Sequence, residues 1–166
     1  MAPLNVSTKE FAAMAGQRIG PSEWMTVTQE MVQTYGETVG DLWWIHVDVP
    51  RAKKAFGGTI VYGLLTLSLV PKMMGELIKL TDHGNDLNYG YDNVRFLSVV
   101  HGGDRIRLTA EIMGAEPRRD GVLCRKKCIV EVEGSEKPAL VADWTMLVFP
   151  RGDESMAEHA GLVGAG

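Results

Sequence analysis

The apolar positions in the first part of the chain recur at helical spacing. Ser7 stands three residues before Glu10, a capping-box spacing that predicts a helix start. Thr28 is placed to cap a second helix, whose apolar residues recur as far as Val39 before Gly40 stops it. The sequence therefore predicts two helices before residue 40. The candidate ends of the first are Gly16 and Gly20.

A longer apolar segment follows at residues 60–80. Thr59 comes after two glycines and is a plausible N-cap for one long helix, apolar nearly all round, as in a buried helix. Pro71 is expected to kink this helix or to end its first half. Between the second and third helices, residues 48–51 read as a short turn.

Beyond residue 86 the pattern changes to strand-like runs separated by glycine-containing turns. This pattern predicts an antiparallel meander after a central helix, hence one α+β domain over residues 1–150. The tail at 151–166, rich in Gly, Ala and acids, is expected to be poorly ordered. The predicted strands are 87–96, 104–113, 122–133 and 139–149.

Composition narrows the class of protein. A hydrophobic fraction of 45% and a charged fraction of 23% are close to globular averages. The net charge of 17 − 21 = −4 argues against a nucleic-acid partner. The N-terminus lacks a signal-peptide pattern, and the longest apolar run, 60–70, is about half the ~20 residues that span a bilayer. We expect a cytoplasmic protein without a membrane partner.

Cys124 and Cys128, on one strand face, are expected to be reduced thiols.

The segment VGDLWWIHVD concentrates chemistry just after the second helix. Asp41 and His46 cannot share a helix face, but a loop after Gly40 allows them to converge, and a carboxylate beside an imidazole suits proton transfer. Spacing alone leaves the alternative of a turn cap and a surface histidine open. Trp43 and Trp44 suit a pocket, an interface or a core equally. The neighbouring acid of the segment, Asp48, is expected to cap a turn.

Other chemistries find less support. A metal reading would combine His46 with nearby acids or with His83 or His101, but no two histidines have ligand spacing, so we expect neither a metal nor a cofactor. Phosphate-binding glycine fingerprints are missing, and Ser68 lacks the glycines of a nucleophile elbow.

The start of the apolar helix is a further candidate site. Backbone N–H groups exposed by Gly57, Gly58 and Gly63 can hold a carbonyl or a developing negative oxygen. The alternative is that these glycines only let helix and sheet approach closely. Tyr62 can offer a hydroxyl to a ligand or fill the core.

Two segments together carry a family resemblance. Residues 41–48, DLWWIHVD, followed by residues 56–67, FGGTIVYGLLTL, resemble the MaoC-like (R)-specific enoyl-CoA hydratase family. The chain looks most like the nodulation-protein-N-like branch, which the segments NYG at 88–90 and VRF at 94–96 also resemble. The similarity covers roughly residues 27–150.

The resemblance implies a hot-dog fold, in which an antiparallel sheet wraps a long central helix, usually in a homodimer or larger assembly. It implies that Asp41 and His46 activate a water that adds to a trans-2-enoyl-CoA thioester, while the Gly63 N–H holds the thioester carbonyl. His46 is then the base, and Asp41 orients the water and handles the second proton. The candidate substrate-binding residues are Tyr62, Trp43, Trp44 and Gly58.

The chain departs from the family pattern at two positions. Tyr62 stands where relatives commonly have histidine, and Trp43 where they more often have Asn or Gln, so the acyl-chain preference is affected most. A hot-dog acyl-CoA thioesterase and a non-catalytic acyl-CoA-binding protein are the alternative functions. Candidates for the coenzyme A phosphates, or else a solvated charge run, are Arg51, Lys53, Lys54 and Arg95.

Overall fold

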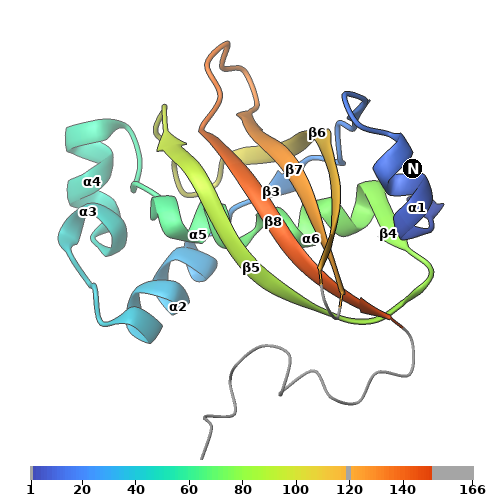
Figure 1. Ribbon diagram of the computed structural model, residues 1–166. Coiled ribbons are helices and arrows are strands. Elements are labelled where there is room, and N and C mark those ends of the chain that lie inside the picture. Colours follow the sequence, from blue (N-terminus) through green and yellow to red (C-terminus); the bar gives the residue numbers. More distant parts are fainter. Residues whose placement is uncertain (1, 119–120, 151–166) are drawn as a thin grey trace, which may run out of the picture.

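A helix in two parts lies across one face of a curved antiparallel sheet (Figure 1). The computed structural model describes residues 2–118 and 121–150, so the predicted tail at 151–166 lies outside the described residues. The helices are α1 (Thr8–Ala13), α2 (Gln29–Val39), α3 (Trp44–Val47), α4 (Val49–Phe56), α5 (Gly63–Ser68) and α6 (Val70–Leu77). The strands are β1 (Leu4–Val6), β2 (Arg18–Ile19), β3 (Met25–Thr26), β4 (Ile78–Leu80), β5 (His83–Phe96), β6 (Arg105–Arg118), β7 (Gly121–Val132) and β8 (Leu140–Pro150).

The first two helix starts form as predicted, because their capping groups are local. The Ser7 hydroxyl accepts a hydrogen bond from the Glu10 N–H at 3.2 Å, and the Glu10 carboxylate accepts one from the Ser7 N–H at 2.7 Å. The Thr28 hydroxyl caps α2, and Gly40 ends it with a φ of 75°. The helix α1 is shorter than predicted, since it stops at Ala13, ahead of both candidate glycines.

Two predictions for residues 48–62 are wrong. The expected turn is the start of α4: Pro50 lies in its first turn, where its missing N–H costs nothing, and the Asp48 carboxylate accepts from the Arg51 N–H at 3.1 Å. Asp48 is therefore a cap, as predicted, but of a helix. Thr59 caps no helix, because residues 59–62 run extended between neighbouring segments before α5 begins at Gly63.

The long apolar helix is divided into two parts, as predicted from Pro71. It separates at Leu69 into α5 and α6, and Pro71 occupies the first turn of α6. Val70, Met73 and Met74 of α6 are buried against the sheet, whereas Leu64 of α5 is 58% exposed. Ser68, Pro71 and Lys72 are exposed as well, so the prediction of a helix buried nearly all round is wrong.

The four long strands form in the predicted order, but the meander prediction is wrong for one of them. The sheet order is β2-β6-β7-β8-β5, with β3 also pairing with β6. Strands β6, β7 and β8 are a meander, whereas β5 pairs with β8 instead of β6 and forms an edge of the sheet. Residues 97–104 therefore cross from β5 at one edge of the sheet to β6, with β7 and β8 lying between these two strands. The parallel β1–β4 pair and the short strands β2 and β3 were not predicted.

The core lies between the sheet and α5–α6. Cys124 and Cys128 point into it from β7 and are free thiols, as predicted from their even spacing. Burial raises the pKa of Cys124 to about 11 and that of Cys128 to about 12. The buried residues of β6 that complete this core are Ile106, Leu108, Ala110 and Ile112.

None of the helices in residues 2–118 and 121–150 has the length and hydropathy needed to span a bilayer.

Candidate functional site

His46 is held in one tautomer by the backbone of the segment that precedes α5. Its Nδ1 lies 2.5 Å from the carbonyl oxygen of Ile60, and the Ile60 N–H donates to the carbonyl of Ile45 at 2.9 Å. Because a carbonyl oxygen only accepts, Nδ1 of the neutral ring carries the proton and Nε2 keeps its lone pair. His46 is 9% exposed. A histidine in this state is able to accept a proton from a water molecule.

Tyr62 connects His46 with the loop that carries Asp41. The rings of Tyr62 and His46 are stacked with their centroids 3.8 Å apart, and the Tyr62 hydroxyl donates a hydrogen bond to the backbone carbonyl of Asp41. Burial, followed by the charge of Asp41 and the neighbouring Tyr35, raises the pKa of Tyr62, so the phenol stays protonated. Tyr62 thus contacts both candidate catalytic residues.

Asp41 lies in a turn that directly follows α2. Its carboxylate Oδ1 accepts a hydrogen bond from the Trp43 N–H at 3.2 Å, and its own N–H donates to the Gly36 carbonyl at 3.0 Å. A Cβ on Gly36 would lie 2.8 Å from the Asp41 carbonyl oxygen and would collide with the Tyr62 hydroxyl. Gly36 is therefore part of the site. The sequence carried a signal for it, a glycine inside a helical pattern, which we did not interpret.

Gln29 is a second residue that the sequence analysis missed. Its side-chain N–H donates to the His46 carbonyl at 2.8 Å, and its side-chain oxygen accepts from the Thr59 hydroxyl. Gln29 thereby joins α2, α3 and the extended segment before α5. A glutamine at the start of a helix has no distinguishing sequence signal, because its partners lie 17 and 30 residues away.

Gly63 opens α5 against the ring of Phe96. A Cβ at position 63 would lie 2.8 Å from that ring, so only glycine fits this close approach. The N–H groups in the first turn of a helix lack intrahelical acceptors. A pocket of about 420 Å³ adjoins this helix start and is lined by Ile60, Gly63, Leu64 and Phe96 among others. His46 and Asp41 do not line this pocket, but the His46 imidazole is hydrogen-bonded to the carbonyl of Ile60, which does line it.

The other three predicted substrate-binding residues show no ring contact with His46 like that of Tyr62, although the Trp43 backbone is hydrogen-bonded to Asp41. Trp43 is 63% exposed, and Trp44 is stacked on Phe56 with ring centroids 5.6 Å apart. Gly58 packs against His101, where a Cβ would lie 3.2 Å from the imidazole side chain. The structure therefore brings Tyr62 to Asp41 and His46, whereas contact of substrate with the two indoles or with Gly58 stays a prediction.

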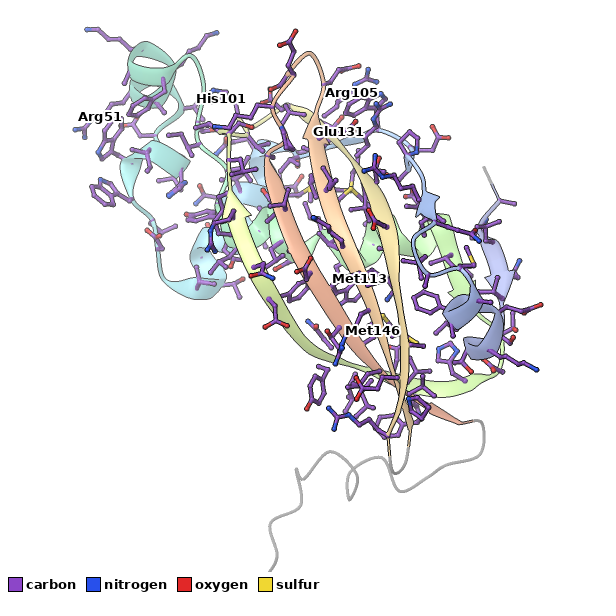
Figure 2. The ribbon with its side chains drawn as sticks, turned by 45° about the horizontal axis from the view of Figure 1, so that its top comes forward. Arg51, His101, Arg105, Met113, Glu131 and Met146 are labelled. Carbon is purple, nitrogen blue, oxygen red and sulfur yellow. The ribbon has the colours of Figure 1, made fainter. Side chains whose placement is uncertain are left out.

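The candidate phosphate contacts lie on α4 and β5. The Arg51 guanidinium lies 4.0 Å from the ring centroid of Trp44, and Figure 2 shows Arg51 on the helical end of the molecule. Lys53 and Lys54 are exposed on the same helix, and Arg95 donates to the Val94 carbonyl at 2.7 Å. Within residues 2–118 and 121–150, no group of three or more His, Cys, Asp or Glu side chains is placed to hold a metal ion.

Comparison with known proteins gives this arrangement a family context. Residues 10–133 match the family described as "MaoC like domain". The chain is 41% identical over 139 residues to 3-hydroxyacyl-thioester dehydratase Z of Mycobacterium tuberculosis, covering 82% of this chain and 92% of that protein. It is 35% identical over 143 residues to Nodulation protein N of Rhizobium meliloti, covering 84% of this chain and 89% of that protein.

Solved structures agree on the fold. A monoamine oxidase regulatory protein from Archaeoglobus fulgius superposes with a TM-score of 0.69 at 25% identity, covering 90% of this chain and 99% of that one. An (R)-hydratase from A. caviae superposes with a TM-score of 0.63 at 20% identity, covering 80% and 94%. The predicted α+β hot-dog fold is confirmed. With its sheet wrapped around α5–α6 and its sequence matched over residues 10–133, this chain belongs to the MaoC-like family of dehydratases.

Proposed function

We propose that this protein is an (R)-specific enoyl-CoA hydratase that reversibly adds water to trans-2-enoyl-CoA, giving (R)-3-hydroxyacyl-CoA. Support comes from membership in a dehydratase family and from the relative named as a 3-hydroxyacyl-thioester dehydratase, since dehydration is the reverse of hydration. The observation that carries the proposal is the hydrogen bond between His46 Nδ1 and the Ile60 carbonyl. It leaves Nε2 as the basic nitrogen that hydration needs.

The proposed reaction begins at His46. Nε2 removes a proton from water while the water oxygen bonds to C3 of the enoyl thioester, and the electron pair of the double bond moves toward the thioester carbonyl. Asp41 hydrogen-bonds the same water and takes part in returning to C2 the proton that Nε2 removed. The other proton of the water stays on the new C3 hydroxyl, so one water molecule is consumed and His46 returns to its starting state.

Gly63 is proposed to stabilise the negative oxygen formed on the thioester. Its N–H belongs to the first turn of α5, where no intrahelical acceptor is available, and the adjoining pocket offers apolar walls for an acyl group. A hydrogen bond to the developing charge is stronger than one to the ground-state carbonyl, so it lowers the barrier.

The assay that tests this proposal follows the loss of the conjugated enoyl absorbance of trans-2-enoyl-CoA. We expect His46→Gln and Asp41→Asn each to lower turnover by roughly 10²- to 10⁴-fold, the range for a lost acid–base group. His101→Gln is a matched control, because Nδ1 of His101 also approaches a backbone carbonyl, that of Thr59, at 3.2 Å. Chiral analysis of the product tests the (R) configuration.

Two outcomes would contradict the proposal. Unchanged turnover in folded His46→Gln and Asp41→Asn variants would exclude the assigned roles. Release of free thiol from acyl-CoA without loss of enoyl absorbance would instead identify a thioesterase, and tight acyl-CoA binding without either reaction would identify a binding protein.

We also propose that the protein is a homodimer formed along β5. Among the described residues, β5 pairs only with β8, so one edge of a 14-residue strand has no strand partner. Tyr89 and Phe96 on this strand are 60% and 50% exposed. Sedimentation equilibrium should give twice the 18.2 kDa mass of one chain, and a single-chain mass would contradict the proposal.

The single domain at 1–150 and the cytoplasmic location stay predictions.

A further inference from the structure

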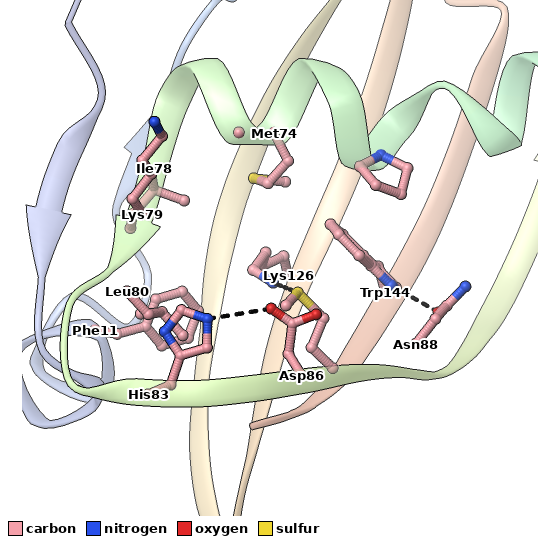
Figure 3. A pocket seen from close by; sticks show the side chains of 13 residues that line it. Phe11, Met74, Ile78, Lys79, Leu80, His83, Asp86, Asn88, Lys126 and Trp144 are labelled. Carbon is pink, nitrogen blue, oxygen red and sulfur yellow. Dashed lines mark hydrogen bonds and ion pairs between the residues drawn. The ribbon is translucent and has the colours of Figure 1, made fainter. Parts of the chain in front are cut away.

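A second pocket, of about 430 Å³, lies between α6 and the sheet (Figure 3). It has no lining residue in common with the pocket beside Gly63. Its walls are mainly apolar, and its volume is within the ~300–1,000 Å³ range of small-molecule sites. The wall residues that matter here are Phe11, Met74, Trp144 and Met146.

Lys126 is the buried lysine among the residues that line this pocket. Its neighbours Arg125 and Lys127 are exposed, but the alternation of β7 turns Lys126 to the face shared with Cys124 and Cys128. Lys126 is only 2% exposed. Lysine is almost never buried to this extent without a partner.

The partners of the Lys126 ammonium group are weak ones. Nζ lies 2.9 Å from the sulfur of Met146, 4.3 Å from the ring centroid of Trp144 and 5.6 Å from that of Phe11. Among the described residues, no oxygen acceptor is placed within hydrogen-bond distance of Nζ. An ammonium group has three N–H donors, and a thioether is a weak acceptor. The group therefore has unused hydrogen-bonding capacity inside the pocket.

The charged groups around Lys126 do not supply that acceptor. Asp86 of β5 is engaged by His83, whose Nε2 lies 3.3 Å from the Asp86 carboxylate, and Nδ1 of His83 is buried without a hydrogen-bond partner. Lys79 of β4 adds a positive charge to the lining. Cys124 and Cys128, on the same strand face, keep their protons because burial raises the pKa of each thiol to about 11 and about 12.

We propose that this pocket binds a small monocarboxylate with an apolar body. Its carboxylate accepts hydrogen bonds from the Lys126 ammonium group, and its hydrocarbon part lies against Trp144 and Met74. A carboxylate supplies the oxygen acceptors that Lys126 lacks, and charge-assisted hydrogen bonds of this type are strong in a desolvated site. The proposal is separate from the hydratase reaction, because it uses neither His46 nor Asp41.

Calorimetric titration of the full chain with octanoate and octan-1-ol at pH 7 tests this proposal, because the two probes differ only in the head group. We expect octanoate to bind at least about tenfold more tightly than octanol, the gain of a hydrogen bond to a charged group. Lys126→Met should lose that preference while still binding octanol, which shows that the pocket is intact. Equal affinities for the two probes in the unmodified protein would overturn the proposal.

Asp86→Asn is the complementary variant. Removing a carboxylate beside the pocket should strengthen octanoate binding severalfold and leave octanol binding unchanged. If no carboxylate binds beside Lys126, Asp86→Asn will not strengthen octanoate binding. That result would overturn the proposal even if Lys126→Met failed to fold.

Discussion

The imidazole of His46 is stacked on the phenol ring of Tyr62, with ring centroids 3.8 Å apart and an angle of 24° between the ring planes. Since the Tyr62 hydroxyl also donates to the Asp41 carbonyl, one side chain orients both proposed catalytic residues. Tyr62 is thus a positioning residue for the proposed reaction.

Tyr62→Phe keeps the stacked ring and removes only the hydroxyl. We expect kcat to fall by about tenfold with little change in KM, and the free energy of unfolding to fall by about 1 kcal/mol, the value of one hydrogen bond. Steady-state kinetics and urea unfolding measure these effects. Tyr35→Phe is the control, because Tyr35 contacts Tyr62 through its ring, with centroids 5.1 Å apart. Equal losses in both variants would contradict the positioning role.

Gly63→Ala places a methyl group against the ring of Phe96. We expect a loss of about 1–3 kcal/mol in the free energy of unfolding, as for overpacking, together with reduced turnover. Gly75→Ala on α6 should instead stabilise the protein by about 0.5–1 kcal/mol, because a Cβ there meets nothing within 4 Å. A double variant with Phe96→Ala should recover part of the stability lost by Gly63→Ala. Failure to recover any would show that the steric explanation is wrong.

Gln29→Leu removes the side chain that supports the His46 backbone. We expect turnover to fall by about tenfold, since His46 and Thr59 each lose a hydrogen bond that fixes their position. Gln33→Leu on the same helix is the matched control, because the Gln33 side chain donates to the exposed Glu37 carboxylate at 2.8 Å and not to the backbone of the site. Turnover that is equally reduced by the control would point to a general effect on α2.

Lys126 should give the protein an unusual dependence of stability on pH. Burial lowers its pKa from 10.5 to about 8, so between these values the unfolded chain holds a proton that the folded chain has lost, and stability rises with pH. From about pH 8 upward the raised pKa values of Cys124 and Cys128 act in the opposite direction, because the thiols of the unfolded chain begin to ionise there. The contribution of Lys126 to the free energy of unfolding should increase by about 1 kcal/mol between pH 8 and 9, and comparison with a variant that lacks Lys126 isolates it.

Lys126→Met is expected to abolish that increase and to stabilise the protein at pH 7, because it removes a poorly solvated charge. Chemical unfolding at pH 7, 8 and 9 measures both effects. Parallel pH profiles for the two proteins would exclude Lys126 as the titrating group. Asp86, whose negative charge raises the pKa of Lys126 slightly, is the charged neighbour to test next.

The sequence by itself determined the features that depend on neighbouring residues. The capping box of Ser7 and Glu10, the end of α2 at Gly40 and the division of the apolar helix near Pro71 all follow from groups within a few residues of one another. The resemblance of two short motifs, residues 41–48 and 56–67, to a known family was enough to identify the family and to name Asp41 and His46 as candidates.

Only the tertiary structure decided which distant segments meet. It paired β5 with β8 and held residues 59–62 in an extended form, where the Ile60 carbonyl selects the tautomer of His46. It also placed Met74 of α6 opposite Lys126 of β7, and the apolar pocket lies between them. Such contacts join residues many positions apart, and their free energy comes from packing and from hydrogen bonds to the backbone. Neither source leaves a periodic signal along the chain.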